Sequence, residues 1–178
     1  LIVSNIAGTT RDAVDTPIEI DGQKYIFIDT AGMRRKSKIK EEIERFSIIR
    51  AVAAVERCDV AILLIDANEG VTDQDTKIAG IANERGKAAI IAVNKWDSVE
   101  KDEKTMNKYL KDISMELKYM EYAPKVFISA MTGQRINRML ELIQTVYHNH
   151  ALRISTGVLN EVLIEATAMQ QPPADKGR

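Results

Sequence analysis

The chain has 178 residues, and 45% of them are apolar, so we expect one domain with a buried core and a short tail. Its 25 basic and 26 acidic residues nearly cancel, which excludes binding of nucleic acid or a membrane through a strong overall charge. The single cysteine, Cys58, excludes an internal disulfide and is expected to be a small buried hydrophobic residue. No apolar run is long enough to span a bilayer and no secretory signal pattern begins the chain, so we expect a cytoplasmic protein with no membrane partner.

The first part of the chain is predicted to form a β-hairpin followed by a helix. Residues 14–20 and 24–29 are two extended runs separated by Asp21-Gly22, a dipeptide favoured in tight hairpin turns. From Ile39 to Val55, apolar residues recur every three or four positions. This spacing predicts an amphipathic helix of about five turns that covers a sheet face.

Strands and helices then alternate along the chain. The apolar runs 60–65, 88–93 and 126–128 are short and continuous, as expected for parallel strands buried on both faces. Helical patterns cover residues 73–85, 103–119 and 135–147. The sequence therefore predicts an α/β fold with three layers, in which helices wrap a mostly parallel sheet and the hairpin forms its one antiparallel edge.

The character of the sequence changes after Tyr147. Residues 148–156 are polar, residues 158–168 favour a short helix, and residues 170–178 contain Pro172-Pro173 in a polar run. We therefore divide the chain into a domain at residues 1–150 and a helix with a linker at residues 151–178.

In a sheet of this kind ligands bind at the carboxyl ends of the strands, so the residues directly after each strand are candidate site residues. The second hairpin strand is followed by Asp29-Thr30-Ala31-Gly32. A carboxylate at a strand end can hold Mg²⁺ through its water shell, and the glycine lets a backbone N–H approach a terminal phosphate. Most D-x-x-G matches taken alone are turns, so this motif is weak by itself.

The strand at residues 88–93 is followed by Asn94-Lys95-Trp96-Asp97. The carboxylate of Asp97 offers acceptors that match the adjacent N–H donors on the edge of guanine, whereas adenine presents the wrong pattern. Asn94 can bond the purine and brace the neighbouring loop, and the stem of Lys95 can lie over the base. This motif is a strong indication of guanine recognition, and we expect Trp96 to be a packing residue within it.

Weaker motifs precede and follow this one. After the last predicted strand, Ser129-Ala130 are small enough to let a backbone N–H reach the base oxygen. In the loop before the hairpin, a threonine hydroxyl of Gly8-Thr9-Thr10 could coordinate Mg²⁺ when a γ-phosphate is present and swing away after hydrolysis. A simple Gly-Thr turn is the alternative for that loop.

These motifs occur in the right order, each on the correct side of its strand. On them the chain resembles the translation-factor-related branch of Ras-like GTPases, and specifically the second GTPase domain of the EngA/Der ribosome-assembly family. The resemblance covers nearly all of the chain. Its most specific segments are residues 7–12, residues 29–36, Gln74-Asp75, residues 94–97, and Ser155-Thr156 with Leu159-Asn160.

The resemblance implies a role for each motif. Thr9, Thr10 and Gly32 would take part in catalysis, and Thr10 and Asp29 would hold Mg²⁺. The set that binds GTP or GDP would be Asp29, Thr30, Ala31, Gly32, Asn94, Lys95, Asp97, Ser129 and Ala130. Ras-type enzymes carry a glutamine directly after D-x-x-G to orient the attacking water, but here that residue is Met33. The resemblance therefore implies the class of GTPase that uses a potassium ion (K⁺) near the phosphates.

The fold that the resemblance implies is a Ras-like P-loop NTPase, yet no G-x-x-x-x-G-K-S/T sequence is present. We expect the first strand and the phosphate-binding loop to lie upstream, and the chain alone to bind nucleotide badly and to be inactive. Without that central strand, its two neighbours are expected to show unpaired edges.

The resemblance also implies partners: a similar GTPase domain before this one, a KH-like domain after Ser155, and contact of the full-length protein with the large ribosomal subunit and its rRNA. The function implied is that of a GTP-binding and GTP-hydrolysing switch in assembly of the large (50S) subunit. The alternative is a regulatory or RNA-interaction module that binds guanine nucleotide without hydrolysing it. Met33 favours the alternative, whereas Thr9, Thr10 and the D-x-x-G motif favour the enzyme.

Overall fold

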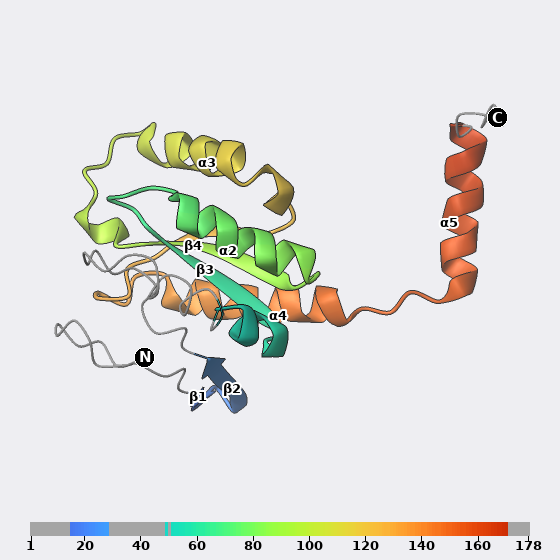
Figure 1. Cartoon of the computed structure of the whole chain (residues 1–178), viewed down its shortest axis with the longest axis horizontal. Coiled ribbons are helices and arrows are strands. Elements are labelled where there is room, and N and C mark those ends of the chain that lie inside the picture. The colour runs from blue at the N-terminus through green and yellow to red at the C-terminus, as the bar shows by residue number, and fades with distance from the viewer. Residues whose placement is uncertain (1–14, 29–48, 50, 171–178) are drawn as a thin grey trace.

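The computed structural model describes residues 15–28, 49 and 51–170 of the chain. Figure 1 shows a central group of parallel strands with helices on both sides, a hairpin at one end, and a last helix that stands apart. The predicted alternation of strands and helices is confirmed in this part of the chain.

The predicted hairpin is present. Strand β1 (Asp15–Ile20) pairs antiparallel with strand β2 (Gln23–Ile28). Between them, Asp21 and Gly22 have φ angles of 52° and 76°. Two successive left-handed residues are what the tightest hairpin turn requires, which is why an Asp-Gly pair favours it.

The three parallel strands lie in the order β3-β4-β5, with β3 at Val60–Asp66, β4 at Ala88–Asn94 and β5 at Lys125–Phe127. The central strand β4 is the most deeply buried, with Ile90, Ile91, Ala92 and Val93 all 0% exposed. Its continuous apolar sequence is therefore explained by burial on both faces.

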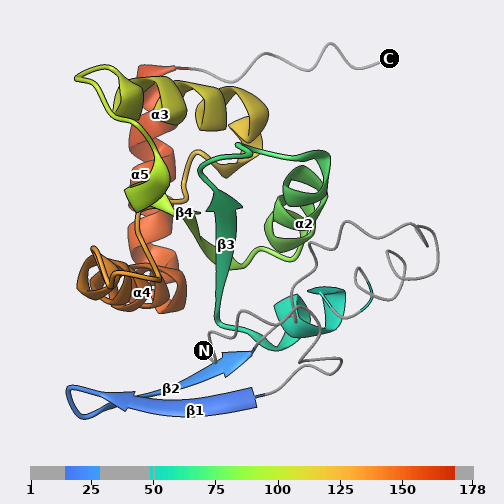
Figure 2. The ribbon, with the colours of Figure 1, turned by 90° about the vertical axis from the view of Figure 1, so that its left-hand side faces the viewer.

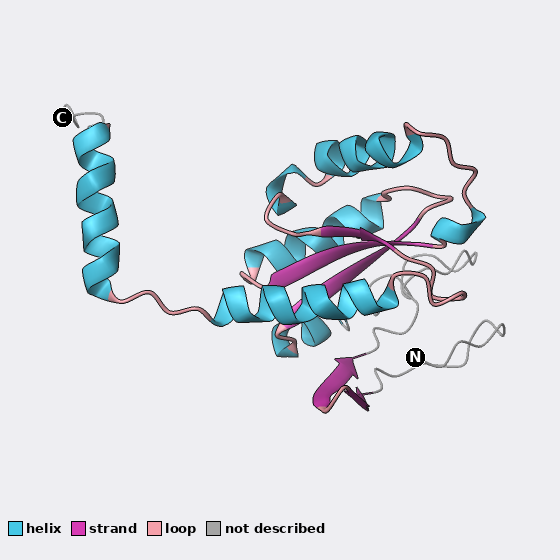
Figure 3. Cartoon of the chain, turned by 180° about the vertical axis from the view of Figure 1, so that it is seen from behind, coloured by secondary structure: helices cyan, strands magenta, loops and turns pink. Residues whose placement is uncertain are grey.

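Helices cover both faces of this sheet. Alternate residues of β4, such as Ala89 and Ile91, pack into one core cluster with residues of α2 (Asp73–Glu84) and α3 (Thr105–Glu116). The intervening residues, such as Ile90, pack with α4 (Ile136–Ala151) on the other face. Figure 3, which views the molecule from behind, shows α4 running across the strands. Short 3₁₀ turns at Trp96–Ser98 and Lys118–Met120 follow β4 and α3, and residues 51–57 are helical.

The parallel strands and the antiparallel hairpin of the predicted α/β fold are both present, and within the described residues they are not joined by strand pairing. Among the described residues, the hairpin forms a separate two-stranded sheet, and neither β1 nor β2 is hydrogen-bonded to β3. Strand pairing needs backbones about 4.8 Å apart, whereas side chains hold this hairpin to the rest of the domain. The amide of Gln144 donates to the hydroxyl of Tyr25 at 2.6 Å, and Arg57 forms an ion pair with Asp15.

The predicted C-terminal helix is confirmed as α5 (Thr156–Met169). Ser155 caps its N-terminus, since the Ser155 hydroxyl accepts from the N–H of Val158 at 3.4 Å. Figures 1 and 2 show it beyond α4, joined by an extended segment. Every residue of α5 is exposed, including Leu159 and Leu163. In the described part of the chain, no helix is long and apolar enough to cross a membrane.

The N-terminus of α2 is held by a reciprocal capping box. The hydroxyl of Thr72 accepts from the N–H of Asp75, and the Asp75 carboxylate accepts from the N–H of Thr72 at 3.0 Å. Asp75 is 4% exposed, so this cap is buried in the domain.

Replacement of Thr72 by alanine is expected to lower the free energy of unfolding by about 1 kcal/mol, because the N–H of Asp75 loses its acceptor and the Asp75 carboxylate loses the hydroxyl that donates to it. Urea unfolding followed by circular dichroism measures this change. Thr145→Ala on α4 is the matched control, since the Thr145 hydroxyl donates only to a carbonyl of its own helix. An equal loss in the two variants would contradict a special role for the cap.

Cys58 is half-buried, and its thiol donates to the carbonyl of Val55 at 3.3 Å. Burial raises the pKa of the Cys58 thiol above its ordinary value of about 9.0, although Lys87 nearby opposes this in part. The expectation of a small buried hydrophobic residue is therefore confirmed only in part.

Alkylation of Cys58 by iodoacetamide is expected to be slow at neutral pH, because only the thiolate reacts. The midpoint of the pH–rate profile should lie above the ordinary thiol value of about 9.0 in the folded chain, and it should return to that value in urea. A folded-state midpoint at or below 9.0 would refute the burial effect.

Candidate functional site

The carboxyl ends of the parallel strands meet at one edge of the sheet. In the register of β3 with β4, Asp66 lies directly opposite Asn94. The backbone N–H of Ala67 donates to the carbonyl of Asn94 at 2.9 Å, which ties the two strand ends together. Figure 2 shows β3 running toward this edge. The loops that carry the predicted site residues after β4 and β5 therefore begin side by side.

Asn94 links the loop after β4 to the loop after β5. Its side-chain oxygen accepts from the backbone N–H of Ala130 at 2.9 Å. Two residues after Asn94, the N–H of Trp96 donates to the carbonyl of Ile128 at 3.0 Å. The bracing bond predicted for Asn94 is present in the structure.

The loop at residues 129–134 is closed by its own hydrogen bonds. Ser129 is 0% exposed; its hydroxyl accepts from the N–H of Thr132 at 3.1 Å, and its N–H donates to Gln134. A backbone N–H of this loop was expected to reach a base oxygen, but the N–H of Ala130 donates to the side-chain oxygen of Asn94. The direct role predicted for Ser129 and Ala130 stays a prediction, and their observed role is to fix the shape of this loop.

The turn after β4 has an unusual backbone. Lys95 adopts φ 61° and ψ 31°, the left-handed region that costs a side-chain-bearing residue about 1–3 kcal/mol. Trp96 directly after it is 2% exposed, with its ring centroid 4.4 Å from that of Phe127 and 5.1 Å from that of Tyr109. Trp96 is thus a packing residue, as predicted, and its burial holds the turn in place.

Asp97 lies in the 3₁₀ turn that follows Lys95. Its side chain is exposed, and it makes no hydrogen bond or ion pair with any residue that the structure describes. Both carboxylate oxygens of Asp97 are therefore available to donors from outside the chain.

Lys95 has a partner that the sequence analysis missed. Its ammonium nitrogen lies 2.7 Å from a carboxylate oxygen of Asp66, whose side chain is only 12% exposed. Burial acts to raise the pKa of Asp66, but the hydrogen bonds and charge of Lys95, with further bonds from Asn68, outweigh it and lower that pKa. The sequence did contain a signal for Asp66, because it directly follows an apolar strand, as the predicted site residues after the other two parallel strands do.

The phosphate-side candidates lie outside the described residues. These are Thr9, Thr10, Asp29, Thr30, Ala31 and Gly32, together with Met33. Within the ranges that the structure describes, no group of three or more His, Cys, Asp or Glu side chains could hold a metal ion. The roles predicted for these residues, including the magnesium ligands, stay predictions.

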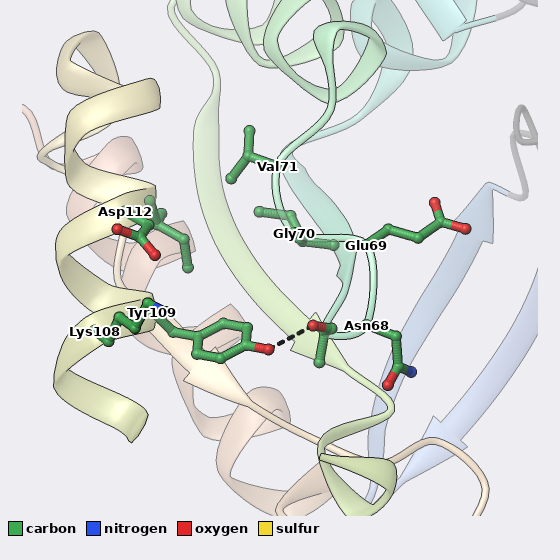
Figure 4. A pocket seen from close by; sticks show the side chains of 10 residues that line it. Asn68, Glu69, Gly70, Val71, Lys108, Tyr109 and Asp112 are labelled. Atoms are coloured by element: carbon green, nitrogen blue, oxygen red, sulfur yellow. Dashed lines mark hydrogen bonds between the residues drawn. The ribbon is translucent and has the colours of Figure 1, made fainter. Parts of the chain in front are cut away.

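A cavity of about 250 Å³ lies between the loop after β3 and helix α3 (Figure 4). Tyr109 and Ala67 both line this cavity, and the hydroxyl of Tyr109 donates to the carbonyl of Ala67 at 2.7 Å. The side chains labelled around it are Asn68, Glu69, Val71, Lys108, Tyr109 and Asp112. None of the predicted site residues lines this cavity, so it is separate from the candidate nucleotide site.

The parallel sheet between two helical layers, with Asn94-Lys95-Trp96-Asp97 at the end of its central strand, defines an α/β domain of the Ras-like GTPase class. A family model described as "50S ribosome-binding GTPase" matches residues 1–95. The chain belongs to this family of GTPases.

Curated relatives agree with this assignment along the whole chain. The chain is 64% identical over all 178 residues to a protein named GTPase Der from Agathobacter rectalis, and 60% identical to the GTPase Der of Acetivibrio thermocellus. These matches confirm the resemblance to the EngA/Der family. The chain spans 40% of the length of these relatives.

Solved structures share the fold. A crystal structure of Era in complex with MgGDPNP and nucleotides 1506–1542 of 16S ribosomal RNA superposes with a TM-score of 0.66 at 26% identity, over 81% of this chain and 47% of that one. A probable GTP-binding protein engB superposes with a TM-score of 0.57 at 21% identity, over 76% of this chain and 84% of that one. The second likeness shows the fold alone.

Replacement of Asn94 by alanine is expected to lower the free energy of unfolding by about 1–2 kcal/mol, because it removes the acceptor of the Ala130 N–H. Thermal unfolding of the chain measures the change, with Asn107→Ala on the exposed side of α3 as the control. If the two variants unfold alike, the bond between the two loops contributes nothing to stability.

Proposed function

We propose that this chain is a switch domain that binds guanine nucleotide and hydrolyses GTP, and that the whole protein acts in assembly of the large (50S) ribosomal subunit. The observation that carries the proposal is the exposed carboxylate of Asp97, which has no partner in the described part of the chain and sits on a turn braced by Asn94 and Trp96. A carboxylate held in this way is suited to a ligand edge with two adjacent N–H donors.

Guanine presents that edge and adenine does not. Adenine would leave the Asp97 carboxylate without donors, and a buried unpaired acceptor is costly, so selectivity follows from the mismatch. The stem of Lys95 covers the base, while Asn94, Ser129 and Ala130 hold the surrounding loops. These five residues are the base-recognition half of the proposed site.

The phosphate half of the proposed site lies on the two switch segments. Thr10 and Asp29 would hold Mg²⁺, together with Thr9, and a bound magnesium ion would supply charge that offsets the negative charge developing on the phosphates. The segment Thr30, Ala31 and Gly32 would supply a backbone N–H to the terminal phosphate. A potassium ion near the phosphates would add positive charge in place of an arginine finger, and Met33 stands where Ras-type enzymes carry the glutamine that orients water.

The proposed partners follow from the family and from the related structure. Relatives named GTPase Der are longer than this chain, which fits a whole protein with a neighbouring GTPase domain and a KH-like domain. We place the domain at residues 1–150 and the connecting helix and linker at residues 151–178, where α5 leaves the body of the fold. The related Era was crystallised with ribosomal RNA, which supports contact of the whole protein with rRNA in the cytoplasm.

The second candidate function is a guanine-nucleotide module that regulates a neighbour, or binds RNA or the ribosome, without hydrolysing GTP. Met33 favours it, because methionine cannot orient an attacking water. Turnover at this site alone separates the two functions.

The test is an altered-specificity variant of the full-length protein. Asp97→Asn is expected to weaken GTP binding at this site by about a hundredfold and to admit xanthosine triphosphate, because xanthine carries a carbonyl where guanine carries an amino group. Xanthosine triphosphate turnover by the variant then reports this site alone, even if the protein contains another GTPase domain. Asp59→Asn, which removes the same charge at the opposite end of β3, is the control.

Turnover of xanthosine triphosphate that is faster in potassium than in sodium buffer supports the hydrolysing switch with its potassium ion. Binding of xanthosine triphosphate without turnover in either buffer selects the regulatory module. If Asp97→Asn leaves guanine preference as it was, the base site is assigned to the wrong residues.

A further inference from the structure

Asp66, Asn68 and Ser98 form a closed ring of hydrogen bonds around Lys95, and none of them belongs to the nucleotide site described above. The Asp66 carboxylate contacts the Lys95 ammonium at 2.7 Å with one oxygen. Its other oxygen accepts from the backbone N–H of Asn68 at 2.9 Å and from the Asn68 amide at 3.3 Å. The charged end of the lysine is thereby fixed to the end of β3.

Ser98 completes the ring from the other side. Its hydroxyl accepts from the Asn68 amide at 2.9 Å and donates to the carbonyl of Lys95 at 2.8 Å. The side-chain oxygen of Asn68 is a second acceptor within reach of the Ser98 hydroxyl, at 3.3 Å, but the carbonyl of Lys95 is nearer. Lys95 is held at both its backbone and its ammonium, while its side chain remains 61% exposed.

This arrangement matters because a lysine stem is flexible. A free lysine side chain samples many rotamers and loses that freedom when its stem is ordered against a ligand. A stem already ordered by an ion pair has less freedom to lose, which strengthens ligand binding without any new contact to the ligand.

We propose that Asp66 is a positioning residue for guanine-nucleotide binding: it orders Lys95 so that the exposed stem lies ready to cover the base. The inference rests on the proposed function of Asp97 and Lys95. The Lys95 ammonium pairs with Asp66, and Asp97 keeps no partner in the described part of the chain.

The charge state of Asp66 supports this role. Its pKa is lowered, so the carboxylate is ionised throughout the neutral range. The ion pair is therefore present under the conditions in which a cellular nucleotide would bind.

The experiment is a double-mutant cycle in the full-length protein. All variants carry Asp97→Asn, and the dissociation constant of xanthosine diphosphate is measured, so that binding reports this site alone. The cycle compares Asp66→Asn, Lys95→Ala and the double variant, because a residue that acts through Lys95 has no effect once the lysine side chain is gone. Asp59→Asn at the far end of β3 is the charge-matched control.

Asp66→Asn is expected to weaken xanthosine diphosphate binding about tenfold when Lys95 is present. In the Lys95→Ala background, Asp66→Asn is expected to leave the dissociation constant unchanged. Ser98→Ala removes the hydroxyl bonds to the Lys95 carbonyl and to Asn68 while it keeps Asp66 and the backbone bond of residue 98 to that carbonyl, and it is expected to weaken binding about threefold. It supplies the same comparison if Asp66→Asn does not fold.

Each other outcome is decisive. If Asp66→Asn weakens binding equally with and without the Lys95 side chain, Asp66 acts on the fold and the inference is wrong. If Lys95→Ala weakens binding but neither Asp66→Asn nor Ser98→Ala does, the ring does not position the lysine. If the Asp97→Asn background binds no xanthosine diphosphate, the proposed function fails first.

Discussion

Burial of β4 on both faces is the constraint on which the rest of the structure depends. Residues Ile90 to Val93 are 0% exposed because α4 covers one set of alternate side chains and α2 with α3 covers the other. The apolar run ends at Asn94, so the chain reaches the edge of the sheet there and has to turn. The position of the sequence that we propose to recognise guanine therefore follows from the length of one apolar strand.

The turn after β4 is stabilised by the burial of Trp96 and by the hydrogen bond of Asn94 to the loop after β5. The left-handed backbone of Lys95 is unfavourable by itself, but the turn that contains it also buries Trp96 against Tyr109 and Phe127. The side-chain oxygen of Asn94 accepts a hydrogen bond from the loop after β5. The aromatic residue in the free position of the motif thus anchors the turn, which leaves the polar residues around it to face outward.

The parts of the fold with a local signature were predictable from the sequence. The continuous apolar run of β4 and the Asp21-Gly22 turn each depend on neighbouring residues alone, and the structure confirms both. Whether the hairpin joins the parallel sheet depends on pairing between residues far apart in the sequence, which no local pattern reports. The contact of Asp66 with Lys95 was missed for the same reason, because it exists only when two strand ends are brought side by side. Among the predicted site residues, those on the phosphate side lie outside the described ranges.

Lys95 pairs with Asp66 and not with Asp97, two residues further along the chain, and this pairing shapes the electrostatics of the site. Pairing with Asp66 neutralises a carboxylate that is 12% exposed, where an isolated charge is costly. Pairing with the exposed Asp97 would gain less, because water already solvates that group. The energetically better pair is therefore also the one that leaves Asp97 unpaired and accessible. In the proposed site, a ligand with two N–H donors can therefore bind the Asp97 carboxylate without first breaking an ion pair. No free energy of binding is spent on displacing Lys95.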